Sequence, residues 1–97
     1  MNMQNIMEQA RKIQADMEKA SKQIEGTEYT AEKVGVKVKI NGKGEVLEVS
    51  LANDDLLKDK ELVEDMLTLL FNEVLTKWQK DKDEKLGKYT NGVGGLF

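Results

Sequence analysis

The chain has no cysteine, no histidine and no proline among its 97 residues. Without imidazole or thiol groups it cannot build the usual zinc sites, a thiolate nucleophile or a serine–histidine triad. The acidic residues fall at the solvent positions of helical patterns, which is typical of surface groups and not of a catalytic acid and base. Glycine motifs of the G-x-x-x-x-G-K-[ST] and G-x-G-x-x-G types are also missing. We therefore expect no enzyme, no metal, no cofactor and no small-molecule substrate.

Long apolar runs are absent as well. No window approaches the roughly 20 apolar residues that span a bilayer, so we expect no membrane partner. The opening stretch MNMQNIMEQARK does not place basic residues before a long apolar run, which would be the pattern of a secretory signal. The lack of cysteine fits a reducing compartment, and we predict a cytoplasmic protein.

The short length of the chain favours stabilisation by a second subunit. A chain of this size removes only about 60 to 65% of its unfolded surface from water on folding. Small domains often gain the missing stability from disulfides, metals or oligomerisation. Because the first two are excluded by composition, a partner subunit remains.

Residues 1–25 predict a long helix. Small or apolar side chains recur at alternating steps of three and four, which is the a/d seam of a heptad repeat. The pattern predicts a helix of roughly 33 Å that ends at Gly26. From the pattern alone, this helix either lies on the protein's own sheet or projects as an arm that engages a partner. The seam consists of Met3, Ile6, Ala10, Ile13, Met17, Ala20 and Ile24.

Residues 26–53 predict a three-stranded antiparallel sheet built on a hairpin. The Asn41-Gly42 pair is a strong hairpin signal, and Lys43-Gly44 behind it suggests a slightly longer loop. A further strand is expected over residues 28–33. In the central strand, the apolar residues Val34, Val36, Val38 and Ile40 alternate with Gly35, Lys37 and Lys39. The return strand places Leu47, Val49 and Leu51 on the core side and Glu48 and Ser50 outside, so Lys37 and Lys39 are expected to face Glu48.

Residues 54–86 predict a long apolar helix followed by a charged C-terminal helix. Leu56-Leu57 forms a short turn, and Asp59 is a candidate N-cap. The apolar stripe beyond it is wider than one sheet and one other helix can cover, so we predict that a second subunit covers the rest. We assign the dimer interface to Leu62, Met66, Leu69, Leu70, Phe71, Val74 and Trp78. Residues 87–97 are rich in glycine and predict a flexible tail, which completes a single α+β domain over residues 1–97.

The net charge of −3 is unevenly distributed. Residues 54–75 carry a balance of −5 and residues 76–97 a balance of +2, whereas the remainder is neutral. The acidic excess lies mainly in the first turns of the apolar helix, where it suits the positive end of the helix dipole. A polyanion partner is therefore not excluded, although acids on the same helices can pair with the basic residues at three or four residues' spacing.

Three stretches resemble the YbaB/EbfC family of bacterial nucleoid-associated proteins. MEQARKIQADMEK (residues 7–19) is similar to the opening helix of that family, VKVKINGKGEVLEVSL (36–51) to its strand–turn–strand, and DKELVEDMLTLLFNEV (59–74) to its core helix. The resemblance implies an intertwined homodimer with projecting helical arms. It also implies binding of double-stranded DNA, with an influence on nucleoid organisation and gene expression.

On the matching helices we nominate basic residues for phosphate contact, which positions a protein on DNA without reading its sequence. The alternative is a dimeric protein–protein interaction module whose lysines only solvate it. The nominated residues are Arg11, Lys12, Lys19 and Lys22 on the first helix and Lys77, Lys80, Lys82 and Lys85 on the last.

Overall fold

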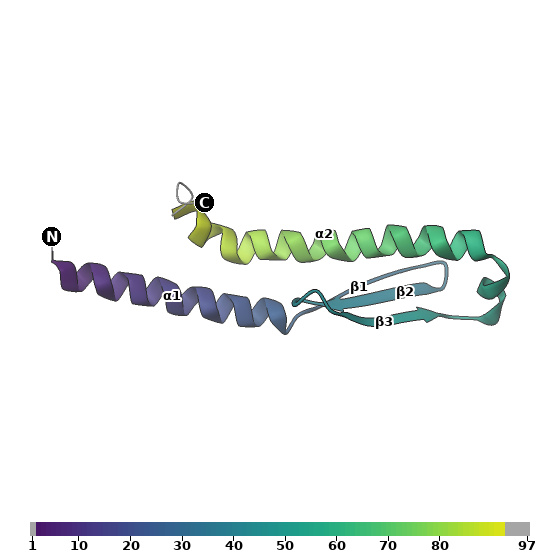
Figure 1. The fold of residues 1–97 in the computed structure, drawn as a ribbon, viewed down its shortest axis with the longest axis horizontal. Coiled ribbons are helices and arrows are strands. Elements are labelled where there is room, and N and C mark those ends of the chain that lie inside the picture. The colour runs from purple at the N-terminus through teal and green to yellow at the C-terminus, as the bar shows by residue number, and fades with distance from the viewer. Residues whose placement is uncertain (1, 93–97) are drawn as a thin grey trace.

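The protein is an elongated two-layer α+β structure in which one long helix lies over a small sheet (Figure 1). This computed structural model describes residues 2–92, with side chains described to residue 89. The principal extents are 69 × 23 × 14 Å. The elements are α1 (Met3–Glu25), β1 (Glu28–Lys33), β2 (Val36–Asn41), β3 (Val46–Leu51), the 3-10 helix η1 (Asp54–Lys58) and α2 (Lys60–Gly92).

Helix α1 begins and ends where its sequence predicts. The Asn2 side chain caps its start by accepting a hydrogen bond from the Gln4 backbone N–H at 2.9 Å. At its end, the Gly26 N–H donates to the Lys22 carbonyl at 3.1 Å. The C-terminal part contacts α2 and buries Ile24, whereas the N-terminal part extends beyond the end of α2 (Figure 1). The helix therefore projects from the body, which is one of the two arrangements that its heptad pattern allows.

The sheet has the order β1-β2-β3 and is antiparallel throughout, which confirms the predicted three strands. One expectation fails at its first turn: Val34 is not part of β2 but of the tight β1–β2 connection. Val34 has φ 45° and Gly35 has φ 84°. Two successive positive φ values are what a two-residue hairpin turn requires, and they leave Val34 61% exposed. Turn geometry therefore overrides the alternation that began at this residue.

The outer face of the sheet carries the predicted charge pairing. Lys37 Nζ and Lys39 Nζ lie 3.7 and 3.6 Å from the Glu48 carboxylate across the β2–β3 ladder. Ser50 donates to Glu48 Oε2 at 3.1 Å. This hydrogen bond, and after it the charge of Lys37, lower the pKa of Glu48. The lysines and Glu48 thus form a polar face that is accessible to solvent, while Val36, Val38 and Ile40 are buried on the other face.

The β2–β3 loop, residues 41–45, is the meeting point of three elements. The Asn41 side chain organises it by accepting hydrogen bonds from the Lys43 and Glu45 N–H groups at 2.9 and 3.0 Å. A Cβ atom at Gly42 would overlap the carbonyl oxygen of Ile24, at the end of α1. A Cβ atom at Gly44 would lie 2.8 Å from the Trp78 ring of α2. Glycine is therefore needed twice, because both helices approach the loop backbone closely.

Helix α2 is a single continuous helix, in place of the apolar and charged helices that we expected in succession. Asp59 Oδ1 caps it by accepting from the Leu62 N–H at 3.2 Å, as predicted. The helix passes through Gly87 and ends at Gly92, so the expected tail does not begin at residue 87. One interior glycine costs only about 1 kcal/mol, which flanking helix-forming residues offset. The rest of the predicted tail, residues 93–97, lies outside the described residues.

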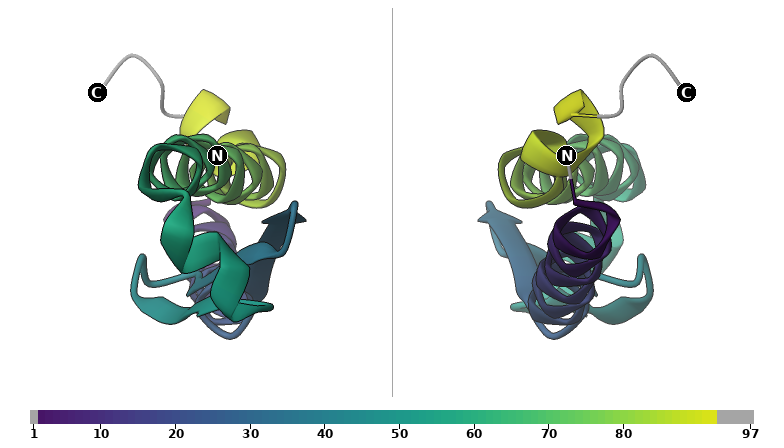
Figure 2. Two further views of the ribbon diagram at one scale, coloured as in Figure 1. Left: turned by 90° about the vertical axis from the view of Figure 1, so that its right-hand side faces the viewer. Right: turned by 90° about the vertical axis from the view of Figure 1, so that its left-hand side faces the viewer.

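Helix α2 lies over one face of the sheet (Figure 2), and the buried side chains of the core lie between the two. Leu70 and Val74 have no exposed surface within the single chain, so these two residues of the predicted dimer interface pack inside the protomer. The helix lies over β1 and β2 but makes few contacts with β3. Consequently Val46 and Val49, which pair with Ile40 and Val38 on the covered face, remain 58% and 49% exposed.

A pair of glycine substitutions tests the role of the β2–β3 loop. Gly42→Ala is expected to destabilise the fold by about 2 kcal/mol or more, because α1 must move away from the new methyl group. The matched control is Gly87→Ala, where a Cβ atom meets nothing within 4 Å and alanine should stabilise the helix by about 0.5 to 1 kcal/mol. Thermal unfolding at one protein concentration, followed by circular dichroism and Trp78 fluorescence, measures both. Equal melting temperatures for wild type and Gly42→Ala would contradict this assignment.

Candidate nucleic-acid interface

The cations of α1 are presented without internal partners. Arg11, Lys12, Lys19 and Lys22 are all exposed. Within the described part of the chain, none of them forms an ion pair, although acids occur three or four residues away on the same helix. The helix therefore offers four positive charges to an external anion. This disposition is what phosphate contact requires.

The lysines nominated on α2 are mostly engaged within the protein. Lys77 Nζ donates to the Thr30 carbonyl of β1 at 2.8 Å. Lys82 Nζ lies 3.9 Å from the centroid of the Trp78 ring, a cation–π geometry. Lys85 Nζ lies 3.3 Å from Asp81 Oδ2. Of the four, Lys80 alone is exposed with no such contact in residues 2–89.

A shallow cleft lies where α1 and α2 run side by side, with a volume of about 390 Å³. It brings Lys19 of α1 together with Lys85 of α2, two residues that were nominated independently. It also adds Lys88, which the sequence does not single out because Gly87 predicts the end of the helix. Since the helix continues, Lys85 and Lys88 are three residues apart and share a face. Asp16, Ala20, Gln23, Glu84 and Tyr89 complete the lining.

The cleft is anchored to the sheet by a buried tyrosine. The Tyr29 hydroxyl of β1 donates to Asp81 Oδ2 at 2.6 Å, and the same carboxylate oxygen faces Lys85. Burial, followed by the hydrogen bond to Asp81 and its negative charge, raises the pKa of Tyr29 to about 12. Asp81 therefore contacts both Lys85, which lines the cleft, and Tyr29 of β1.

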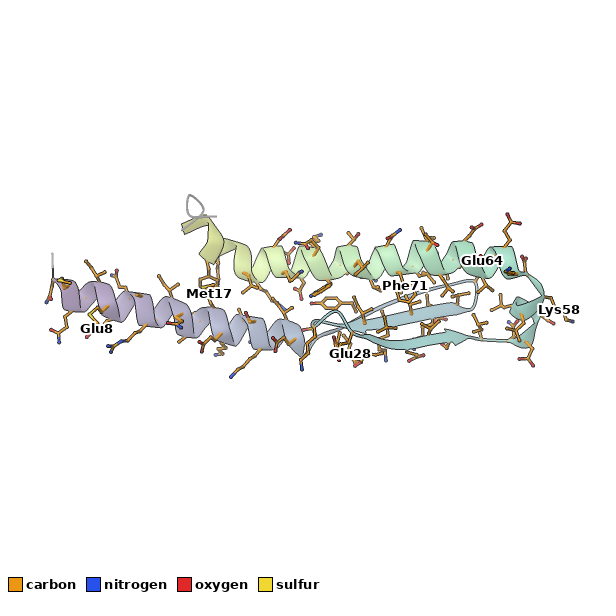
Figure 3. The ribbon with its side chains drawn as sticks, in the orientation of Figure 1. Glu8, Met17, Glu28, Lys58, Glu64 and Phe71 are labelled. Carbon is orange, nitrogen blue, oxygen red and sulfur yellow. The ribbon has the colours of Figure 1, made fainter. Side chains whose placement is uncertain are left out.

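The acidic excess of the chain lies towards one end of its long axis. Lys58 and Glu64 lie at the η1 end, where the acidic excess of residues 54–75 begins, and Glu8 lies near the opposite tip of α1 (Figure 3). The acidic end is thus remote from the cations of α1. A polyanion can approach the helical end without meeting the acidic cluster.

Two other kinds of site are absent from the described residues. No group of three or more acidic side chains there could hold a metal ion. No helix in that part of the chain is both long and apolar enough to cross a bilayer. The cations of α1 and the α1–α2 cleft remain as candidates for binding an anion.

The fold is that of a small α+β protein whose long N-terminal helix projects and carries exposed cations. The chain matches the YbaB/EbfC DNA-binding family over residues 1–93. A nucleoid-associated protein of Agathobacter rectalis is 38% identical over 97 residues, which cover 97% of this chain and 86% of the relative. Another nucleoid-associated protein, from Methylococcus capsulatus, is 35% identical over 92 residues, which cover 93% of this chain and 86% of the relative. A third, from Mycoplasmopsis pulmonis, is 39% identical over 79 residues, with 79% and 78% covered.

The chain belongs to the YbaB/EbfC DNA-binding family. The resemblance drawn from the three sequence stretches is thereby confirmed. The family is described by DNA binding and not by an enzymatic activity.

The Tyr29–Asp81 contact predicts an alkaline loss of stability. The pKa of Tyr29 in the folded state, about 12, lies above its ordinary value of 10.0, so the folded state holds this proton more tightly than the unfolded chain. The resulting stability is fully present below pH 10 and is lost as the pH rises towards 12. Spectroscopic titration of tyrosinate should lose its transition near pH 12 in Tyr29→Phe. The free energy of unfolding, measured with denaturant, should also fall less between pH 10 and 12 in Tyr29→Phe than in the wild type. An unchanged titration in this variant would contradict the assignment.

Proposed function

We propose that the protein binds double-stranded DNA as a homodimer through basic residues on its helical arms. In this role it is a cytoplasmic, nucleoid-associated protein that influences nucleoid organisation and gene expression. Family membership supports DNA as the polyanion. The single structural observation that carries the proposal is the set of exposed, unpaired cations on the projecting helix α1.

The binding mode follows from where the charges lie. Lysine and arginine side chains on α1 contact phosphates, release counterions and fix the orientation of the protein without reading bases. Lys19, Lys85 and Lys88 meet in the α1–α2 cleft, where a phosphate group can be reached from both helices. Lys77 and Lys82 hold β1 and Trp78 in place, so their contribution to DNA binding is smaller than that of Lys80 or the α1 cations.

The homodimer is supported by apolar surface that one chain leaves uncovered. Val46 and Val49 continue the covered face of the sheet beyond the edge of α2. On α2, Phe71 and Leu75 lie on the same flank as Trp78, which contacts the loop leading into β3. Leu75 is 45% exposed. Exposed apolar side chains on neighbouring elements are typical of an interface, and the same surface on a second copy can cover them.

The remaining residues predicted for the interface retain surface that a partner can reach. Leu69 is 45% exposed. Leu62, Met66, Phe71 and Trp78 are half-buried against the core. We assign them to the rim of the same interface, with the exposed face of β3 at its centre.

The alternative function is a protein-interaction module. It is favoured by one observation, the internal engagement of Lys77, Lys82 and Lys85, which accounts for three lysines without DNA. Replacing these three lysines and Lys80 with glutamine separates the two functions. DNA binding predicts a loss of affinity, whereas the interaction module predicts little change in binding to its protein partner.

A charge substitution on the sheet tests the dimer. Val49→Lys is expected to shift the protein from dimer to monomer in sedimentation experiments, because it places a charge in an apolar interface. Val34→Lys serves as the control, since it adds the same charge at a 61% exposed position in the β1–β2 turn. A wild-type protein that sediments as a monomer, or a Val49→Lys variant that stays dimeric, would refute the interface.

Paired lysine substitutions test the DNA contact. Wild-type protein should bind labelled duplex with a log–log salt slope of about −3 to −6, measured by fluorescence anisotropy. Lys19→Gln/Lys22→Gln should flatten that slope by about 2 units, because each lost phosphate contact removes about 0.9. Lys58→Gln/Lys60→Gln removes the same charge at the acidic end and should leave the slope unchanged. Equal slopes for both variants would place the DNA elsewhere, and no binding at low salt would refute DNA binding.

A further inference from the structure

The tip of α1 carries an apolar stripe that nothing in the described chain covers. Because α1 extends past the end of α2, the first four positions of its heptad seam find no neighbour (Figure 1). Met3, Ile6 and Ile13 are 76%, 48% and 50% exposed, and Ala10 between them is exposed as well. Met7, beside the seam, is 52% exposed. DNA does not account for this surface, since phosphate contact needs cations and not apolar side chains.

The charges of α1 avoid this stripe. In the heptad frame, Arg11, Lys12, Lys19 and Lys22 fall at the outer b, c and f positions. The e and g positions beside the seam are Met7, Gln9, Gln14, Asp16, Ser21 and Gln23, of which only Asp16 is charged. Two copies can therefore approach seam to seam without opposing like charges. Their cations remain on the outside.

We propose that the tip of α1 pairs antiparallel with the tip of α1 from a second dimer. The pairing is centred on Glu8. Its layers place Met3 of one copy against Ile13 of the other, and Ile6 of one copy against Ala10 of the other. Every layer then holds one larger and one smaller or flexible side chain, and the two helix dipoles oppose each other favourably. A parallel pair would instead stack Ala10 on Ala10 and bring two positive helix ends together.

Geometry places the second copy in a different dimer. From Glu8 to the end of α1 at Glu25 is about 25 Å, so two chains paired at the tips have their sheets about 50 Å apart. They cannot also share the β3 and α2 faces proposed for the dimer. Arm pairing therefore joins one dimer to the next and, resting on the proposed DNA binding, bridges two stretches of duplex.

The pairing is weak when the protein is free. Four partly exposed side chains on each helix bury far less than the roughly 1,200 to 2,000 Å² of a stable interface. Dimers held side by side on DNA experience a high effective concentration, which converts a weak contact into a populated one. The bridge therefore forms mainly on DNA or in concentrated protein.

Cross-linking tests the register directly, because the chain has no cysteine of its own. Full-length Ile6→Cys and Ala10→Cys proteins are mixed at high concentration and treated with a short bifunctional thiol reagent. The mixed product, which joins one variant to the other, should exceed both self-products by about fivefold or more in mass spectrometry, since antiparallel coiled-coil layers face a to d. Dominant self-products, or no product above that of an Ala15→Cys control, would overturn the proposal.

A bridging assay tests the consequence. Wild-type protein should retain a labelled duplex on an immobilised one, and Ile6→Gln/Ile13→Gln should reduce that retention about tenfold because avidity is lost. The variant should still bind a single short duplex within about twofold of wild type, and Ala15→Gln on the outer face should behave as wild type. Full retention by the seam variant would overturn the proposal. If wild type binds no duplex at all, DNA binding fails, while the cross-link in DNA-free protein still decides the arm pairing.

Discussion

The rest of the structure depends on the close approach of both helices to the β2–β3 loop. Gly42 meets the carbonyl oxygen of Ile24 and Gly44 meets the Trp78 ring, so one short loop fixes where α1 leaves the body and how α2 crosses the sheet. Neither helix could hold the other alone, because α1 overlaps α2 only in its C-terminal part (Figure 1). A shift of this loop would open the α1–α2 cleft and separate Lys19 from Lys85. The electrostatic surface proposed for DNA therefore rests on a steric constraint at two glycines.

The lysines of the two long helices divide into two groups, according to whether they make contacts within the protein. Within the described residues those on α1 form no ion pair, so their charges are available to phosphate. In α2, by contrast, Lys77 bonds to β1, Lys82 stacks on Trp78 and Lys85 pairs with Asp81. An engaged lysine still carries its charge, so it contributes to the field that attracts DNA even when it cannot reach a phosphate. In the proposed complex, direct phosphate contacts should accordingly come mainly from α1. Helix α2 adds positive potential, and its two cleft lysines, Lys85 and Lys88, add contacts near its end.

Local signals in the sequence predicted most of the fold, and contacts distant in sequence account for what they missed. The first helix, the Asp59 cap and the Asn41-Gly42 turn each depend on a few neighbouring residues, and all three were confirmed. Val34 was misplaced because its positive φ is imposed by the turn that joins two paired strands. Leu70 and Val74 were given to a partner because a helical stripe does not reveal which part its own sheet covers. The partners of Lys77 and Asp81 lie about 50 residues away, a relation that no periodicity encodes. DNA came from family resemblance, since the charge pattern alone does not name a polyanion.

Two separate apolar surfaces then remain on one small chain, and their positions assign them different tasks. The β3 face adjoins the core and extends it, so covering it adds to the stability that a domain of this size lacks. The seam at the tip of α1 lies far from the core and adds nothing to folding, because the helix already stands by its caps and by its base against α2. An exposed apolar surface that does not help the fold is accounted for by the proposed contact with another copy. The charges agree with this division, since the cations line the outer side of α1 and leave the seam clear for another copy while DNA is bound.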